Sequence, residues 1–397
     1  MNNPDLDKLQ LLPDTELELR LARLRDLMSA ADIDAVLISS NSNIYYLTGR
    51  IFCGYIFIPL AGSPVYAVRR PSILKGDGIE HIRKIEDLPS RLGSGFSSLG
   101  LEMADTSYLN VCRFRKAFGD RIRYENASGI MTQARSVKTG FELEKIRFSG
   151  IKHTSLYERI PHIYRQGMSD IDLQIEIERA ARHEGCLGLF RINGDDMELF
   201  MGNILVGDNA DCPSPYDFAM GGAGLDPSLP VGADGSLIRP GKSIMVDVNG
   251  NFTGYMTDMT RCFAQMENLP QRAWEAHQTS IDICDTLADM GRPGVEARTL
   301  YEKALAMARD SGFESEFMGH RQQAGFVGHG LGIEINELPV IAPRSKSVLQ
   351  AGNVIALEPK FVIPGVGAVG IENTYIVKTD GPMECVTNAP KQIIYFE

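Results

Sequence analysis

Apolar and polar residues alternate over residues 243–263, on both sides of the polar run Asn249-Gly250-Asn251. Alternation with a period of two predicts strands, and Asn and Gly between two strands predict a turn, so a β-hairpin or two adjacent strands are expected here. Asp247 and Asp258 lie within this stretch among apolar neighbours. Burying an Asp in an apolar strand is costly unless a cation compensates its charge. The alternative for either Asp alone is a solvated carboxylate at a strand end.

Three more polar residues interrupt apolar, strand-like runs further along the chain. They are His329 between two glycines, Glu358 before Pro359, and Glu372 after Val-Gly-Ile. Carboxylates and one imidazole from separate strands make an oxygen-rich set that suits Mn, Co, Fe or Zn. Four carboxylates together can hold two divalent ions.

The first third of the chain predicts a small α/β domain, because helical and strand-like patterns alternate there. Leu17, Leu21, Leu24 and Met28 form one apolar stripe of a helix over residues 14–31, which Asp14 or Thr15 is expected to cap. The other predicted elements are strands near residues 35–38, 52–58, 65–68 and 99–102, and a helix over 109–118.

The pattern changes around residues 127–139, before a long charged helix. We therefore expect two domains, residues 1–134 and 135–397. The second domain is expected to alternate strand pairs with amphipathic helices. These helices are predicted to begin near residue 142 and to span residues 170–183, 280–290 and 296–308.

Composition excludes several classes of protein. The net charge of −11 over 397 residues argues against nucleic-acid binding, which needs a basic face. No run approaches 18 apolar residues, so no membrane-spanning helix is predicted. The start of the chain has no signal-peptide pattern, and its seven cysteines form no CxxC pair. These features predict reduced thiols in a cytoplasmic protein.

The order Asp, Asp, His, Glu, Glu resembles that of the pita-bread metallopeptidases, which include Xaa-Pro aminopeptidase and prolidase. The run 254–261 is similar to the motif around the family's second Asp, residues 328–332 to its GHG-x-G, and Glu358-Pro359 to its Glu-Pro pair. The resemblance covers nearly the whole chain. It implies an α+β fold, with a pita-bread catalytic domain preceded by a smaller α/β creatinase-like domain.

The resemblance also implies roles for individual residues. The metal ligands would be Asp247, Asp258, His329, Glu358 and Glu372. They would hold two divalent ions, with Mn or Co ahead of Zn or Fe, and a bridging hydroxide. Glu358 would also carry the proton from water to the leaving amine, and Tyr255, Thr260 and Arg261 would orient Asp258. The alternative for Arg261 is a surface ion pair. A homodimer is expected by analogy with similar proteins.

Four positions depart from the peptidases that the chain resembles. Pro230 and Asn336 stand where those enzymes carry histidines that bind the substrate, and Gly370 and Asn373 replace an Arg and an Asp. Asn336 still offers a hydrogen-bond donor for a carbonyl oxygen, so we count it as a catalytic candidate. The metal ligands thus look intact, whereas the residues that polarise the substrate are changed.

Three functions remain open at this point. The first is a metal-dependent exopeptidase that hydrolyses Xaa-Pro bonds of small peptides. The second is a metal-dependent hydrolase or lyase of a small non-peptide molecule, which the four departures favour. The third is a binding protein that has lost catalysis.

A few other residues are given ordinary structural roles. We expect Tyr45 and Tyr46 to pack beside a strand, with a substrate or subunit surface as the alternative. His153 and His162 are expected on the surface of a helix, and His320 at a helix end or in the core.

Overall fold

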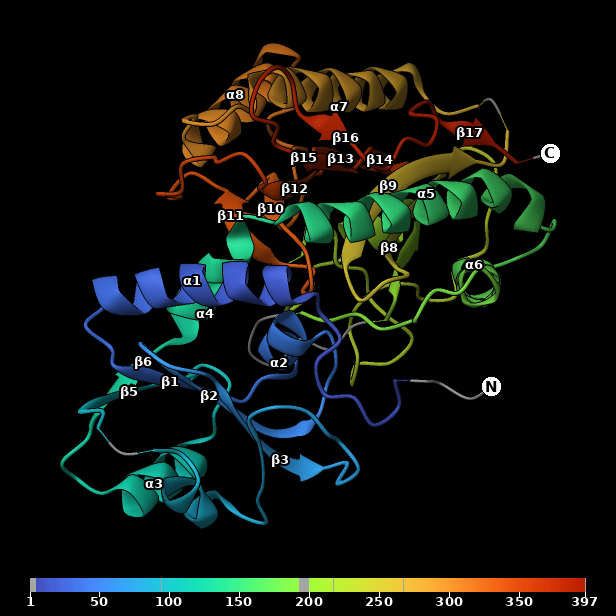
Figure 1. Ribbon diagram of the computed structural model, residues 1–397. Helices are drawn as coiled ribbons and strands as arrows, with labels where there is room; N and C mark the ends of the chain where they lie inside the picture. Colours follow the sequence, from blue (N-terminus) through green and yellow to red (C-terminus); the bar gives the residue numbers. More distant parts are fainter. Residues whose placement is uncertain (1–4, 94, 193–199, 217, 267, 397) are drawn as a thin grey trace. The chain divides into compact units, whose positions relative to one another are not determined.

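The computed structural model describes residues 5–93, 95–192, 200–216, 218–266 and 268–396 (Figure 1). The chain divides into two compact units, Met1–Arg135 and Ser136–Glu397. Each unit combines helices with β-sheet, and all of the metal-ligand candidates belong to the second.

The N-terminal unit is built on a six-stranded sheet in the order β4-β3-β2-β1-β5-β6. Central strand β1 pairs antiparallel with β2 and parallel with β5. The strands are β1 (Ala35–Ile38), β2 (Cys53–Pro59), β3 (Val65–Arg70), β4 (Ile79–His81), β5 (Ser98–Leu101) and β6 (Arg123–Asn126). The helices are α1 (Asp14–Ala30), α2 (Asn41–Thr48), α3 (Tyr108–Phe118) and α4 (Ser128–Ser136), with the 3-10 helix η1 (Ile85–Ser90). The α/β organisation predicted here is confirmed.

Helix α1 forms where the apolar stripe predicted it. Leu21, Leu24 and Met28 are buried. The predicted capping by Asp14 or Thr15 is wrong, because the capping position is taken by Pro13, whose side chain makes no capping hydrogen bond.

Tyr46, one of the two tyrosines for which packing was expected, lies in the interior of the N-terminal unit. Tyr46 is fully buried, and the guanidinium of Arg20 lies 4.4 Å from the centre of its ring. Arg20 is itself buried and donates to Glu16 at 2.6 Å. Packing, rather than a surface role, is therefore what Tyr46 does.

The C-terminal unit contains three sheets and four α-helices among its described residues (Figure 1). The sheets have the orders β11-β10-β12-β15-β16, β17-β9-β8-β7 and β13-β14. The strands are β7 (Gly202–Val206), β8 (Ser243–Asn251), β9 (Met256–Ala264), β10 (Gly328–Gly330), β11 (Glu337–Ile341), β12 (Val354–Leu357), β13 (Lys360–Ile363), β14 (Gly367–Gly370), β15 (Asn373–Ile376), β16 (Glu384–Cys385) and β17 (Ile394–Tyr395). The helices are α5 (Gly140–Ile163), α6 (Asp170–His183), α7 (Gln271–Met290) and α8 (Ala297–Asp310), with the 3-10 helix η2 (Gly207–Asp211).

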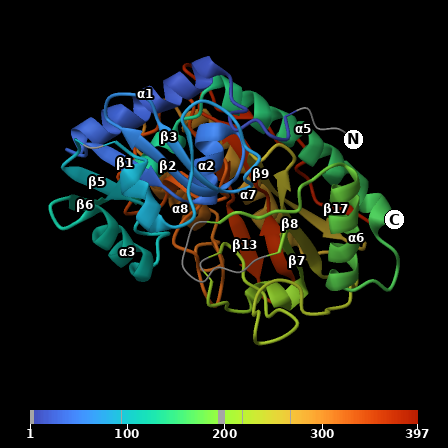
Figure 2. The same cartoon turned by 60° about the horizontal axis from the view of Figure 1, so that its bottom comes forward.

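The helices of this unit cover its sheets. Helix α5 packs along β8 and β9, and α6 lies against β7 (Figure 2). Helix α7 packs on β13 and β14, whereas α8 lies against β11. The strands that carry the metal-ligand candidates are therefore enclosed by apolar side chains from these helices.

The predicted hairpin is present, but its turn is displaced. Strands β8 and β9 pair antiparallel from Ser243 opposite Ala264 to Asn251 opposite Met256. The turn therefore spans residues 252–255, and Asn249-Gly250-Asn251 belongs to strand β8, so the predicted turn position is wrong. Gly250 is needed in the strand because a Cβ there would meet the ring of His153 at 2.6 Å.

His153 is buried, contrary to the surface position expected for it. Its side chain lies on the inner face of α5, where Nδ1 is 3.0 Å from the hydroxyl of Thr257 and the ring packs edge-on against Tyr157. The stripe of α5 that faces the sheet has a helical spacing, and His153 falls on it. His162, near the end of the same helix, is exposed as expected.

Candidate metal centre

Five predicted ligands reach one pocket from different elements. Asp247 lies in β8, Asp258 in β9 and His329 in β10, whereas Glu358 directly follows β12 and Glu372 directly precedes β15. All five line the same pocket, which holds about 600 Å³ of empty space. The hairpin register contributes to this convergence, because Asp247 is paired with Thr260, and Asn249 with Asp258. Paired residues of antiparallel strands point to the same face of the sheet.

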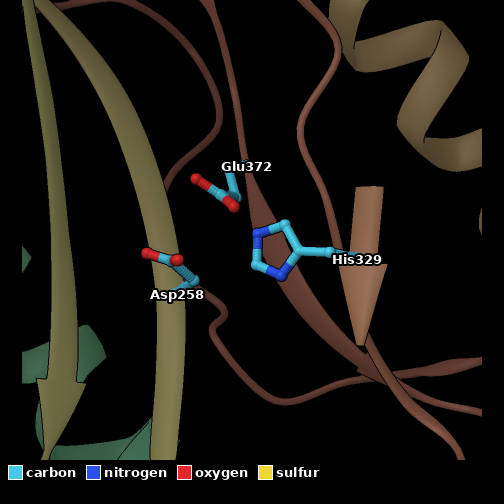
Figure 3. A group of neighbouring side chains, drawn as sticks. All are labelled: Asp258, His329 and Glu372. Carbon is cyan, nitrogen blue, oxygen red and sulfur yellow. The ribbon is translucent and has the colours of Figure 1, made fainter. Parts of the chain in front are cut away.

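Asp258, His329 and Glu372 form the tightest group. Each offers one ligand atom, and these three atoms lie within 4.8 Å of one another. Figure 3 shows the three side chains turned toward a common point. Asp258 and Glu372 are buried, and the side chain of His329 is largely so.

Lys360 is a member of the centre that our sequence analysis did not identify. Its ammonium lies 2.8 Å from Asp247 Oδ2, 2.9 Å from Glu358 Oε2 and 3.3 Å from Glu372 Oε2. The Lys360 side chain is completely inaccessible to solvent. The sequence did contain a signal, because a Lys begins the apolar run Phe361-Val362-Ile363 two residues after a ligand candidate.

His329 and Glu358 form a charged pair beside Lys360. His329 Nε2 lies 3.3 Å from Glu358 Oε1. Burial lowers the pKa of His329, but the hydrogen bond and charge of Glu358 outweigh burial and bring that pKa to about 8. Burial raises the pKa of Glu358, yet Lys360 and His329 together bring it down to about 2. Because a metal binds neutral imidazole, metal binding at His329 would release this proton.

The two carboxylates of the tight group, Asp258 and Glu372, have too little positive charge nearby to keep their pKa values in the usual range. Burial, and then the charges of Glu372 and Asp247, raise the pKa of Asp258 well above its usual range. Burial raises the pKa of Glu372 to about 8, although the ammonium of Lys360 opposes this shift. The pKa of Lys360 is lowered by burial but raised further by the three carboxylates around it, so this group keeps its charge.

These residues fit a divalent cation. Oε1 of Glu372 is buried and has no hydrogen-bond partner among the described residues, a costly state for a carboxylate oxygen. A cation bound between Asp258, His329 and Glu372 would supply the missing partner, and two carboxylates with one imidazole suit Mn, Co, Fe or Zn. The arrangement of these three residues therefore accommodates one ion.

The predicted supporting residues are all buried, but their contacts differ from those expected. The hydroxyl of Thr260 donates to Glu372 Oε2 at 2.8 Å, so the carboxylate it orients is Glu372. Arg261 is fully buried and donates to the backbone oxygen of Glu372 and to the side chain of Asn373. A surface ion pair is therefore excluded for Arg261. Tyr255 is buried in the turn before β9.

The remaining walls of the pocket combine apolar side chains with three amides, those of Asn203, Asn249 and Asn336. The apolar side chains are Phe190, Ile192, Phe218, Ala219, Met220, Phe326 and Ile335. Asn336 lines the same pocket as the ligand candidates, which places its amide within the site. Pro230 makes a different contact, because its carbonyl oxygen accepts a hydrogen bond from Ser214. His320 pairs with Asp211, at 3.1 Å.

Family comparison matches both units of the chain. Residues 144–379 match the model of metallopeptidase family M24, and residues 20–137 match the creatinase/prolidase N-terminal domain. The chain belongs to metallopeptidase family M24. The pita-bread catalytic domain and creatinase-like N-terminal domain expected from the sequence are thereby confirmed, as is a peptidase-type hydrolase. The family also implies divalent metal ions.

Relatives of this family member share nearly its full length. The uncharacterised peptidase YqhT of Bacillus subtilis is 26% identical over 395 residues, which cover 95% of this chain and 99% of YqhT. The Xaa-Pro dipeptidase of Pyrococcus horikoshii is 23% identical, with 94% and 98% covered. Among solved structures, the Xaa-Pro dipeptidase from Bacillus anthracis has a TM-score of 0.80 at 22% identity, with 96% and 99% covered. At that identity the structural likeness supports the fold alone.

Among the described residues, no helix combines the length and the apolar character needed to cross a membrane.

Proposed function

We propose that this member of family M24 is a metal-dependent exopeptidase that hydrolyses Xaa-Pro bonds of small peptides. The observation that carries the proposal is the pocket that joins the Asp258–His329–Glu372 group to an apolar wall and to the amide of Asn336. An apolar wall suits the ring of proline, and the two full-length relatives named above are a peptidase and an Xaa-Pro dipeptidase.

The side chains of the pocket divide the work of peptide hydrolysis. A bound divalent ion supplies Lewis acidity, which lowers the pKa of water. Glu358 is ionised and lines the pocket, so it would accept a proton from water and return it to the leaving amine. The amide of Asn336 donates to the oxygen of the scissile carbonyl. The hydroxide bridging two ions, the homodimer and the cytoplasmic location remain predictions from the sequence.

Release of the N-terminal amino acid from Xaa-Pro peptides tests this proposal. The protein would be loaded with Mn(II) or Co(II) and incubated with a panel of Xaa-Pro dipeptides and Xaa-Pro-Xaa tripeptides, with Asp258→Asn as the matched control. We expect cleavage by the wild-type chain and none by the variant. No cleavage of any Xaa-Pro peptide by a chain shown to contain metal would refute the proposal.

A small non-peptide substrate is the second candidate. The observation that favours it is the set of departures at Pro230, Asn336, Gly370 and Asn373 from the peptidase pattern. A screen of small amides, betaines and sulfonium compounds with the same metal-loaded chain distinguishes it. Turnover in this screen, together with inert Xaa-Pro peptides, would decide for the second candidate.

A further inference from the structure

The ammonium of Lys360 is held by three of the five predicted metal ligands. Its three N–H donors match three carboxylate acceptors, on Asp247, Glu358 and Glu372. Lys360 is the first residue of β13 and directly follows Pro359. Its side chain is completely buried. A buried ammonium is retained only when its charge is compensated, and here every donor has a carboxyl oxygen as its acceptor.

This ammonium lies where a second ion would have to bind. Asp247 and Glu358 are the two ligand candidates outside the tight Asp258–His329–Glu372 group, and their carboxylates lie 2.8 Å and 2.9 Å from the ammonium of Lys360. An ion bound by Asp247 would lie about 2.0–2.2 Å from an oxygen of the carboxylate that already holds the ammonium. It would then lie against a fixed positive charge in a buried site, where repulsion between cations is strong.

We propose that Lys360 permanently takes the place of one of the two ions, so that the centre binds one divalent ion per chain. Asp258, His329 and Glu372 hold this ion, and Asp247 binds Lys360 instead of metal. The buried Oε1 of Glu372, which has no hydrogen-bond partner among the described residues, independently favours one cation bound at this group. The inference rests on the metal dependence proposed above, but it concerns the number of ions and not the substrate.

Metal stoichiometry tests the inference directly. Protein stripped with a chelator would be titrated with Mn(II) by calorimetry, and bound manganese would be counted by mass spectrometry after desalting. We expect one ion in the wild-type chain and two in Lys360→Met, because that variant frees the oxygens of Asp247, Glu358 and Glu372. Lys391→Met removes a lysine that pairs with Asp285 at a solvent-accessible position, so it should keep one ion. Two ions in the wild-type chain, or one in Lys360→Met, would overturn the inference.

A second pair of variants keeps the test decisive even if Lys360→Met fails to fold. Asp247→Asn should still bind one Mn(II), with an affinity within about 10-fold of wild type, because Asp247 is not a ligand of that ion. Asp258→Asn should weaken binding by about 100-fold or more, since it removes a direct ligand. Equal losses in the two variants would show that Asp247 binds metal, and the inference would then be wrong.

The electron paramagnetic resonance spectrum of the Mn(II)-loaded wild-type chain gives a further readout. An isolated ion produces a six-line signal, whereas two ions that share carboxylates are magnetically coupled and produce a broadened one. We expect the isolated signal at saturating Mn(II), and a coupled signal would contradict the inference. A chain that binds one ion but cleaves no Xaa-Pro peptide would refute the proposed substrate and leave this inference intact.

Discussion

Two buried histidines of the C-terminal unit make the stability of the fold depend on pH. Burial lowers the pKa of His153 to about 3 and that of His277 to about 4. In the unfolded chain these groups bind protons near pH 6.5, so the unfolded state binds more protons than the folded state below that pH. Their contribution to stability is therefore complete above pH 6.5 and is lost as the pH falls toward 3. We expect His153 alone to remove about 2–3 kcal/mol from the free energy of unfolding by pH 4.5.

Urea unfolding at pH 7 and at pH 4.5 measures this loss. His153→Phe should be about 1 kcal/mol less stable at pH 7, because it loses the hydrogen bond to Thr257. The same variant should lose less stability than wild type between the two pH values. His162→Phe, at an exposed position of the same helix, should follow wild type. Identical pH slopes for His153→Phe and wild type would contradict the prediction.

The amide of Asn336 gives a second prediction at this scale. Asn336→Asp keeps the shape of the side chain but removes its N–H donors, and it places a negative charge near the oxygen that becomes negative during hydrolysis. We expect kcat for a cleaved Xaa-Pro peptide to fall by about 100-fold, the usual effect of losing one such donor. The metal content should not change. Unaltered kcat would remove Asn336 from the catalytic residues.

Individual residues differ in how far the sequence could place them. The five ligand candidates were found because charged residues in apolar strands are rare and because their order resembles a known family. Lys360 carries the same kind of signal, yet a lysine is normally solvated, and only the fold shows that three carboxylates surround it. The burial of His153 was likewise hidden, since it depends on the contact of α5 with β9.

At the scale of elements, periodicity predicted which helices and strands form better than it predicted where they begin and end. Helix α6 has the predicted bounds, 170–183, because its apolar stripe and its capping box of Ser169 and Asp172 both act locally. The turn of the β8–β9 hairpin was misplaced, because Asn249-Gly250-Asn251 has the composition of a turn. A tertiary contact, the ring of His153 against Gly250, decides that this run continues the strand.

Arg261 is one of the residues that join strand β9 to the segment of Glu372. This buried side chain donates to the backbone oxygens of Thr260, Glu372, Ala389 and Pro390 and to the side chain of Asn373. We expect Arg261→Lys to lower the free energy of unfolding by about 3 kcal/mol or more, because an ammonium has fewer donors and leaves buried acceptors unpaired.

Thermal and urea unfolding of Arg261→Lys test this role. Arg309→Lys is the matched control, since Arg309 forms an exposed pair with Glu314 and should be replaceable without a measurable change. If both variants unfold like wild type, Arg261 does not hold the two segments together.

At the scale of the whole molecule, the two-domain fold followed from the resemblance and not from periodicity alone. The ligand motifs indicated the family, and the family implied the fold. The family-model matches over residues 20–137 and 144–379 confirm that fold. The way in which two separate sheets bring β8, β9, β10 and β12 to one pocket is a property of long-range packing. No local pattern in the chain predicts it.

Metal removal should distinguish a centre that contains a fixed ammonium from one that does not. A single ion at 100 times its dissociation constant stabilises the folded chain by about 3 kcal/mol, so chelation should cost the wild-type protein that amount. In Lys360→Met, chelation also leaves Asp247, Glu358 and Glu372 without a cation. We expect this to lower the free energy of unfolding by a further ~3–5 kcal/mol. Thermal unfolding of both chains in chelator and in excess Mn(II) measures the difference. Lys391→Met should respond to chelation as wild type does. If wild type and Lys360→Met lose the same stability on chelation, the ammonium does not compensate the carboxylates. The metal-free centre would then be as stable without the ammonium as with it.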